Sequence, residues 1–276
     1  MRLAIIGAKG QVGWELSQRA PAFGHAVLAW DVDTLDITDA NAVDEALASS
    51  DAHAVINAAA YTAVDKAEQE PALAFAVNRD GPAHLAAACA RLRIPLLHIS
   101  TDYVYDGAKI DPYVEDDPTT PLGVYGASKL AGDETVRQLL PRHLILRVSW
   151  VFGVHGHNFV KTILRLARER EELRVVADQR GCPTFAGDIA DTLLELAGRI
   201  AETVQVKISA MPATPLGGPI TIAGNRRPPG MASPAPSSKA CAPADRCRRA
   251  PSSPSPPPSI RCPPRGRSIR CWIAPS

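Results

Sequence analysis

The chain of 276 residues lacks the features that mark several classes of protein. No apolar run comes near the roughly 20 residues needed to span a bilayer. The amino terminus enters a glycine loop at Gly7 before any cleavage pattern of a secretory signal appears. Outside the last quarter the only cysteines are Cys89 and Cys182, and the cysteine spacings match no zinc pattern. We therefore expect a cytoplasmic protein without a membrane anchor or a disulfide framework.

The last quarter of the chain, residues 205–276, has almost no acidic or aromatic residues. It holds one acid, Asp245, and one aromatic residue, Trp272, against eleven Lys and Arg residues and 16 of the 25 prolines. Its net charge is near +10, whereas residues 1–204 are near −9. A segment of this composition cannot bury a core, so we expect it to be disordered. Without interleaved aromatic residues, we do not expect it to bind nucleic acid.

The amino-terminal region predicts a nucleotide-binding unit. Residues 2–7 are nearly all apolar, which is typical of a strand buried on both faces of a parallel sheet. Gly7, Gly10 and Gly13 follow, ahead of a helix predicted to start at Gln11. Glycines allow the backbone to turn tightly and approach a pyrophosphate, and the helix amino terminus supplies free N–H groups. A plain tight turn is the alternative interpretation.

An acid ends the next predicted strand, residues 26–31. Asp31 lies 18 residues beyond Gly13, near the spacing expected for a carboxylate that binds a ribose. Such a carboxylate would repel a 2′-phosphate, which favours NADH, although Arg2 or Lys9 could offset the repulsion. The alternative is that Asp31 only ends the strand.

The segment around Tyr125 predicts the chemistry of carbonyl reduction. Tyr125 and Lys129 are four residues apart in a predicted helix, so their side chains project from one face. An ammonium beside a phenol lowers the phenol's pKa from about 10 and makes its proton available. Upstream, the predicted strand 96–100 places Thr101 and Asp102 at its carboxyl end, where ligands bind in open α/β sheets. Thr101 could donate to a substrate carbonyl or only form a turn.

Two further residues have open roles. Asn78 interrupts a predicted helix over residues 71–91 and could make a structural hydrogen bond or belong to a proton path. Trp150 follows a predicted strand over residues 143–147 and could stack on a sugar or base, or belong to the core.

Six motifs in residues 1 to about 200 resemble the extended short-chain dehydrogenase/reductase family. They are GAKGQVGWEL (7–16), NAAAYTAVDKAE (57–68), STDYVYDG (100–107), PLGVYGASKLAGDE (121–134), LRVSWVFG (146–153) and DQRGCPT (178–184). The resemblance implies an α/β fold, a Rossmann-type doubly wound parallel sheet, with a smaller, here incomplete, substrate domain and a disordered tail. The expected divisions are a NAD(P)-binding domain at 1–150, a partial substrate region at 151–204 and the tail at 205–276.

The resemblance also assigns roles to residues. Thr101, Tyr125 and Lys129 would be catalytic, and Thr101, Asp102 and Trp150 would bind a sugar nucleotide. The cofactor, NADPH or NADH, would contact Gly7, Gly10, Gln11, Val12, Asp31, Asp36, Ile37, Ala60, Tyr61, Thr62, Tyr125 and Lys129. The implied reaction is reduction of the 4-keto group of a dTDP-linked deoxyhexulose. Some relatives hold Mg²⁺ at a dimer contact that would involve Glu15, but no metal site is assigned, and a homodimer is only a possibility.

The resemblance ends where the composition changes. We expect a frameshift near residues 217–219, because suitable codons for residues 218–239, read two nucleotides later, can spell a sequence like HHCGKPPSTWHGFARAIFE, which the family would have there. Turnover would then be reduced or lost. Two other functions stay open: another epimerase or reductase of the extended family acting on sugar nucleotides, and a regulatory subunit that binds NADP without turnover. A dehydratase is disfavoured because Tyr103 follows Asp102 where that reaction needs a second acid.

Overall fold

The computed structural model describes residues 1–176, 179–207, 219–221 and 270–272. The chain forms two compact units. The first contains Met1–Asn158 and continues at Gly181, and the second contains Phe159–Arg180.

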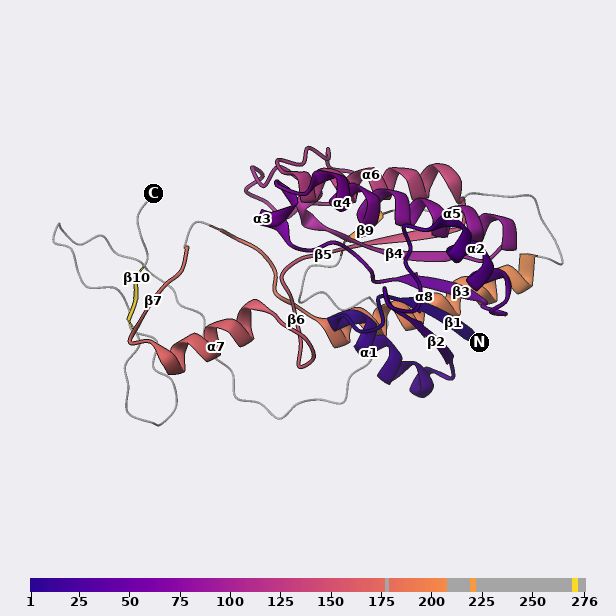
Figure 1. The fold of residues 1–276 in the computed structure, drawn as a ribbon, viewed down its shortest axis with the longest axis horizontal. Coiled ribbons are helices and arrows are strands. Elements are labelled where there is room, and N and C mark those ends of the chain that lie inside the picture. The colour runs from indigo at the N-terminus through magenta and orange to yellow at the C-terminus, as the bar shows by residue number, and fades with distance from the viewer. Residues whose placement is uncertain (177–178, 208–218, 222–269, 273–276) are drawn as a thin grey trace. The chain divides into compact units, whose positions relative to one another are not determined.

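A sheet of six parallel strands forms the centre of the first unit (Figure 1). The strands are β1 (Arg2–Ile6), β2 (Ala26–Trp30), β3 (Ala54–Asn57), β4 (Leu96–Thr101), β5 (His143–Val148) and β9 (Pro219–Thr221). Their order across the sheet is β2-β1-β3-β4-β5-β9. Every residue of β3 and β5 is buried, as expected of strands covered on both faces. The expected doubly wound parallel fold is confirmed.

Helices cover both faces of this sheet. On one face, α1 (Gln11–Arg19) packs on α8 (Ala186–Lys207), and their apolar side chains share a core with β1 and β3. On the other, α5 (Gly81–Leu92) packs between α2 (Ala40–Ala48) and α6 (Val124–Leu139). The chain leaves β1 toward β2 on one side and returns to β3 on the other, so the strand order reverses between β1 and β3. Ligands of doubly wound sheets bind at such a point.

Local sequence explains how individual helices begin. Asp39 caps α2, because its carboxylate accepts hydrogen bonds from the N–H groups of Asn41 and Ala42. The helix predicted over residues 71–91 is present but interrupted: α4 (Pro71–Phe75) passes into a π-helical turn, Ala76–Asp80, before α5 begins. Such single π turns are frequent at functional sites.

Short elements complete the first unit. They are 3₁₀ turns at Ala20–Phe23 and Asp102–Val104, helix α3 (Val64–Ala67), and a two-stranded parallel pair of β6 (Val151–Phe152) with β8 (Thr184–Phe185).

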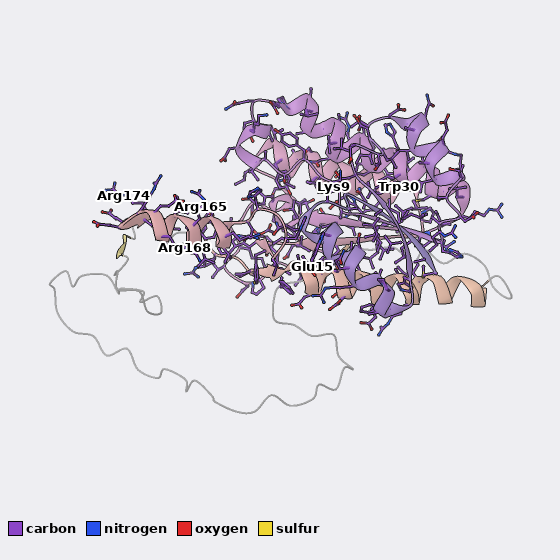
Figure 2. All side chains as sticks on the ribbon, turned by 60° about the horizontal axis from the view of Figure 1, so that its bottom comes forward. Lys9, Glu15, Trp30, Arg165, Arg168 and Arg174 are labelled. Atoms are coloured by element: carbon purple, nitrogen blue, oxygen red, sulfur yellow. The ribbon has the colours of Figure 1, made fainter. Side chains whose placement is uncertain are left out.

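The second unit contains α7 (Phe159–Glu169), β7 (Glu172–Arg174) and β10 (Arg270–Trp272), and β7 pairs parallel with β10. Arg165 and Arg168 project from α7, with Arg174 on β7 (Figure 2). None of the side chains of α7 is buried.

Only three pieces of the expected disordered tail are described: the last residues of α8, β9 and β10. The rest of residues 205–276, including most of the segment in which a frameshift is expected, lies outside the described residues. Within the described part of the chain, none of the helices is long and apolar enough to cross a membrane.

Candidate active site

The glycine turn after β1 is shaped by close backbone contacts. Gly7 has φ +77°, and a Cβ there would lie 2.6 Å from the backbone nitrogen of Ala59. A Cβ on Gly13 would lie 2.0 Å from the Gly7 carbonyl oxygen, so its absence lets α1 pack on the turn. Gly10 is the N-cap of α1 and leaves the first turn without a side-chain cap. The N–H groups at a helix start can bind phosphate, so this turn fits a dinucleotide.

Asp31 lies just past β2 and contacts the glycine turn. Its Oδ2 accepts a hydrogen bond from the backbone N–H of Lys9 at 2.7 Å. The Lys9 ammonium extends to Asp33, whose Oδ2 is 2.5 Å from Nζ, and this pairing raises the pKa of Lys9 and lowers that of Asp33. Lys9 thus lies by the end of β2, where Trp30 accepts a backbone hydrogen bond from Ala8 (Figure 2). An acid and a cation therefore both lie where a ribose is expected.

Four other residues expected at the cofactor, on α1 and in the loop after β2, have local partners. Gln11 accepts a hydrogen bond on Oε1 from Asn158 at 3.0 Å, and Val12 is buried in the core beside α8. Asp36 is exposed and accepts from the backbone N–H of Thr38 at 2.9 Å. The Ile37 side chain is buried in the core on the other face. The structure gives Val12 and Ile37 packing roles.

The segment after β3 is held by Asn78 from the π-helical turn. Asn78 accepts from the N–H of Tyr61 at 2.8 Å and donates to the Tyr61 carbonyl at 3.0 Å and to Ser128 Oγ at 3.0 Å. These bonds use both ends of the amide, so its contacts are structural, as one of the two interpretations held. The neighbours Ala60 and Thr62 are thereby positioned, while the Tyr61 hydroxyl donates to Glu70 at 2.8 Å.

Tyr125 and Thr101 meet at the carboxyl end of β4. Both side chains are buried, with Tyr125 near the start of α6 and Thr101 ending β4. Burial raises the pKa of Tyr125 to about 12, while a hydrogen bond with Thr101 acts in the opposite direction. The expectation of a lowered pKa is therefore wrong for this structure, because burial of the phenol outweighs its polar partner. The Tyr125 ring also meets Tyr103 edge-on, with centroids 5.4 Å apart.

Lys129 lies one turn further along α6 and is 2% exposed. Its Nζ donates to the Ile99 carbonyl at 2.7 Å and lies 3.2 Å from Nε2 of His98. Burial lowers the pKa of Lys129 to about 8, although Asp133 acts in the opposite direction. The ammonium is thus placed by the end of β4.

Two glycines allow α6 to approach its neighbours this closely. A Cβ on Gly126 would lie 2.2 Å from the carbonyl oxygen of Tyr103, and one on Gly132 would lie 2.0 Å from that of Asn78. Contacts this short do not occur for real side chains, so both positions require glycine.

The predicted substrate residues line the same edge. Asp102 follows Thr101, and burial raises the pKa of its carboxyl group. Trp150 lies just beyond β5 with φ +46°, a conformation that is rare for a bulky residue, and 46% of it is exposed. Strained, partly exposed residues cluster at ligand sites. At 46% exposure Trp150 is not a core residue, and its contact with a sugar nucleotide stays a prediction.

Sequence reasoning missed a buried polar cluster beneath these residues. Asn57, His98, Asp133 and Arg147 come from β3, β4, α6 and β5, and each is at most 2% exposed. His98 and Arg147 lie inside strands whose neighbours are apolar, and that polarity was the only signal available in the sequence.

Glu15, on α1, is engaged by a neighbouring cation. Its Oε2 accepts from Arg19 Nε at 2.8 Å, and Arg19 also donates to Asp191 at 2.9 Å (Glu15 is labelled in Figure 2). Among the described residues no group of three or more His, Cys, Asp or Glu side chains could hold a metal ion.

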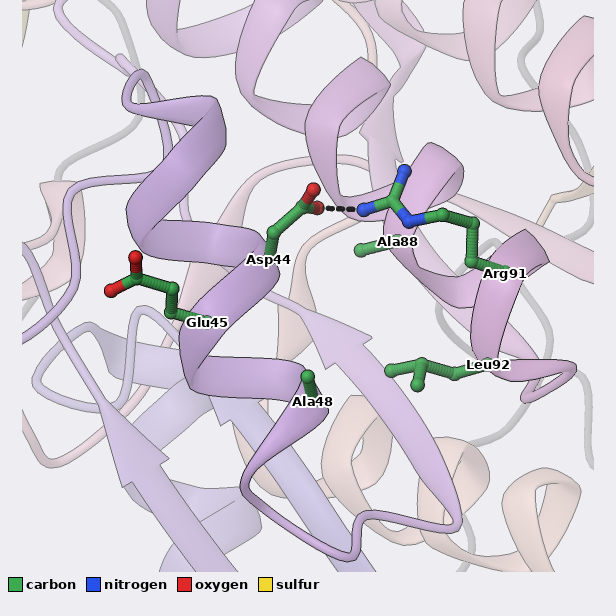
Figure 3. Close-up of a pocket in the computed structure, with 6 residues that line it drawn as sticks. All are labelled: Asp44, Glu45, Ala48, Ala88, Arg91 and Leu92. Carbon is green, nitrogen blue, oxygen red and sulfur yellow. Dashed lines mark hydrogen bonds and ion pairs between the residues drawn. The ribbon is translucent and has the colours of Figure 1, made fainter.

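A surface hollow of about 310 Å³ lies elsewhere, between α2 and α5 (Figure 3). Its lining comprises Asp44, Glu45, Ala48, Ala88, Arg91 and Leu92, and an ion pair joins Arg91 to Asp44. These residues occupy the carboxyl-terminal halves of both helices, which lead into the starts of β3 and β4. The hollow is thus at the edge of the sheet opposite Tyr125.

Comparison with known proteins identifies the family. Residues 1–209 match the family described as RmlD substrate binding domain. The chain belongs to this family. A dTDP-4-dehydrorhamnose reductase of Sinorhizobium fredii is 48% identical over 200 residues, which is 72% of this chain and 67% of the relative. One of Aggregatibacter actinomycetemcomitans is 48% identical over 210 residues, or 75% of this chain and 71% of the relative.

Solved structures agree with this family. A dTDP-4-dehydrorhamnose reductase of Bacillus anthracis in complex with NADP superposes with a TM-score of 0.73 at 36% identity, covering 82% of this chain and 75% of that one. A UDP-glucose 4-epimerase of Brucella ovis has a TM-score of 0.66 at 18% identity, which shows a shared fold alone. The resemblance to the extended family is confirmed.

Proposed function

We propose that the protein is a dTDP-4-dehydrorhamnose reductase, which reduces dTDP-4-keto-6-deoxy-L-mannose to dTDP-L-rhamnose with NADPH or NADH. The observation behind this proposal is the buried pairing of Tyr125 with Thr101 at the carboxyl end of β4, in a chain whose relatives are reductases of that name. A phenol and a hydroxyl side by side can both donate hydrogen bonds to a carbonyl oxygen.

The cofactor residues fit a dinucleotide. The open first turn of α1 would bind the pyrophosphate, and Asp31 with Lys9 would lie at the adenosine ribose. Bound there, the nicotinamide supplies the hydride for the keto carbon. Gly7, Gly10 and the segment Ala60 to Thr62 would shape the rest of the cradle.

Tyr125 would act as the general acid. Since burial holds its pKa at about 12, the phenol keeps its proton across the neutral range and can give it to the oxygen on which charge develops. Thr101 would share that charge through its hydroxyl. Lys129 lies beneath, with its nitrogen fixed by the Ile99 carbonyl, and would hold the nicotinamide ribose.

The sugar nucleotide would be held by Asp102 and Trp150. The half-exposed indole offers a flat face on which a sugar or base can stack, and the half-buried carboxyl group of Asp102 offers hydrogen bonds. In the family, residues beyond about 217 would complete this substrate-binding part of the site. A change of reading frame there would remove them.

An absorbance assay tests the function. Purified protein with dTDP-4-keto-6-deoxy-L-mannose should oxidise NADPH or NADH, and a version with the reading frame restored after residue 217 should do so faster. Cofactor binding without oxidation by either version would reject the reductase and favour a binding protein. Sequencing the gene decides the frameshift, since codons unable to spell the expected segment would exclude it.

A further inference from the structure

Asn57, His98 and Lys129 form a buried chain of polar groups under the active site. Asn57 and His98 are 0% exposed and Lys129 is 2% exposed. Asn57 Nδ2 lies 3.1 Å from His98 Nδ1, and His98 Nε2 lies 3.2 Å from Lys129 Nζ. Groups buried this deeply exchange hydrogen bonds with each other rather than with water, so their protons must be arranged compatibly.

The orientation of the Asn57 amide follows from its other partner. The backbone N–H of Ala59 donates to Asn57 Oδ1 at 3.1 Å. A backbone N–H can only donate, so the atom that receives it is the carbonyl oxygen and the atom facing the ring is the NH₂ group. That NH₂ group donates to Nδ1 of His98. In a neutral imidazole one nitrogen accepts and the other bears the proton, so the proton of His98 is on Nε2.

This tautomer places an N–H opposite Lys129. An ammonium has three N–H donors and no lone pair, so a protonated Lys129 would set donor against donor at 3.2 Å. A neutral amine has a lone pair for the Nε2–H of His98 and still donates to the Ile99 carbonyl at 2.7 Å. Every donor in the row of Asn57, His98 and Lys129 therefore faces an acceptor when Lys129 is neutral.

The surrounding charges are consistent with this arrangement. Asp133, on the same helix as Lys129, has Oδ1 3.8 Å from His98 Nε2, too far for a hydrogen bond. Its Oδ2 accepts from Ser100 Oγ at 2.9 Å and forms an ion pair with Nε of Arg147 at 3.6 Å, whereas its buried Oδ1 has no hydrogen-bond partner in the described part of the chain. His143 on β5 also acts on His98.

Burial shifts the pKa values of His98 and Lys129 toward the neutral forms that the hydrogen bonds require. Burial holds the pKa of His98 well below its ordinary value, so the ring is neutral. Burial also lowers the pKa of Lys129 against the opposing effect of Asp133.

We propose that Asn57, acting through the His98 ring, is a positioning residue that biases Lys129 toward its neutral amine form. Among the described residues, neither Asn57 nor His98 forms a hydrogen bond with Tyr125; they act through the nitrogen of Lys129. The value of this bias for catalysis rests on the proposed function. The proton state of Lys129, however, is measured without substrate, so either idea can fail separately.

Nuclear magnetic resonance of the full chain tests the proposal. The ¹⁵N shifts of the His98 ring distinguish the two neutral tautomers, and the ¹³Cε shift of Lys129 follows its titration. The spectra of Lys129→Met and His98→Gln assign the two signals. We expect the Nε2–H tautomer in the unchanged protein, and finding the Nδ1–H tautomer overturns the proposal.

Two variants test the role of Asn57 and His98. Asn57→Asp accepts from Nδ1–H, which moves the ring proton and leaves Nε2 free to accept from an ammonium. His98→Gln is neutral and can turn its amide oxygen toward Lys129. Each should raise the midpoint of Lys129 by about one pH unit or more. An unchanged titration midpoint of Lys129 in His98→Gln overturns the proposal. A rise in Asn57→Asp alone does not support it, because the added negative charge would raise the midpoint by itself.

The pH profile of turnover gives a second readout. In His98→Gln, the part of the pH–rate profile that follows the titration of Lys129 should move to higher pH. The shift should equal that of the midpoint measured from the ¹³Cε signal of Lys129. A drop in rate without this shift indicates a purely structural role and also overturns the proposal.

Discussion

Gly181 lies against the indole of Trp150: a Cβ on Gly181 would come within 2.5 Å of the indole Cε2 atom. Trp150 has φ +46°, which is unfavourable for a bulky residue. Contacts with its surroundings must therefore maintain this conformation. Motifs that are 31 residues apart in sequence thus meet at one side chain.

Gly181→Ala should displace the indole and weaken binding of the sugar nucleotide. We expect KM for the keto-sugar to rise roughly tenfold, the size of a lost contact worth about 1.4 kcal/mol, with cofactor affinity unchanged. Steady-state kinetics and a cofactor titration measure both. Gly198→Ala is the matched control, because a Cβ at Gly198 in α8 meets nothing within 4 Å. An equal KM in the two variants would show that the indole does not bind the sugar.

Tyr125→Phe should abolish most turnover while leaving the fold intact. Loss of a general acid costs about 10²-fold to 10⁴-fold in rate, and the phenyl ring still fills the site of the buried phenol. NADPH oxidation with the keto-sugar measures the rate, and cofactor fluorescence measures binding. Tyr113→Phe provides a control on a loop, where the hydroxyl donates to Asp106 and accepts from the N–H of Lys109. A Tyr125→Phe variant within tenfold of the unchanged rate contradicts the assignment.

Lys129→Met should stabilise the protein more at pH 7 than at pH 10. The pKa of Lys129 falls from 10.5 to about 8 on folding. Below pH 8 the ammonium is present in both states and its burial destabilises the fold by roughly 3 kcal/mol. Between pH 8 and 10.5 the unfolded chain binds a proton that the folded chain lacks, so stability rises with pH and the penalty disappears.

Thermal unfolding at the two pH values measures this difference. Lys66→Met is the control, because that side chain is largely exposed and its pairing with Glu70 raises its pKa. Its effect on Tm should be the same at pH 7 and pH 10. If Lys129→Met changes Tm by the same amount at both pH values, burial of the ammonium does not destabilise the protein.

Asp33→Asn should improve the use of NADPH relative to NADH. The Lys9 ammonium is paired with Asp33, and removing that carboxylate leaves the cation free for a 2′-phosphate beside Asp31. We expect several-fold tighter binding of NADPH, about 1 kcal/mol at low salt, with NADH unchanged. Asp51→Asn makes the same charge change in the turn before β3, where Asp51 pairs with Arg2. Equal changes for both cofactors would contradict this placement of the ribose.

The sequence was most informative where short-range patterns decide the structure. The apolar run of β1 and the glycines after it predict their elements because each depends on neighbours in the chain. The sequence also placed Tyr125 and Lys129 on one helix and Thr101 at a strand end, and the structure has them there.

Long-range packing decided what the sequence could not predict. The raised pKa of Tyr125 comes from burial, and the partners of Lys129 come from β4, so neither follows from the spacing of four residues. The π-helical turn at Asn78 has no local signal either, and the amide of Asn78 bonds to Tyr61 in the loop after β3 and to Ser128 on α6. In the sequence His98 is a single polar residue in an apolar strand. Its contact with Asn57 depends on the pairing of β3 with β4, which the sequence does not show.

The fit of α6 against its surroundings has a consequence for engineering new substrate preferences. Carbonyl oxygens occupy the space where side chains at Gly126 and Gly132 would begin, so any larger residue at either position must displace α6 from the backbone on which it packs. A library that seeks to accept other sugars should leave these two glycines unchanged and diversify the partly exposed Trp150 first.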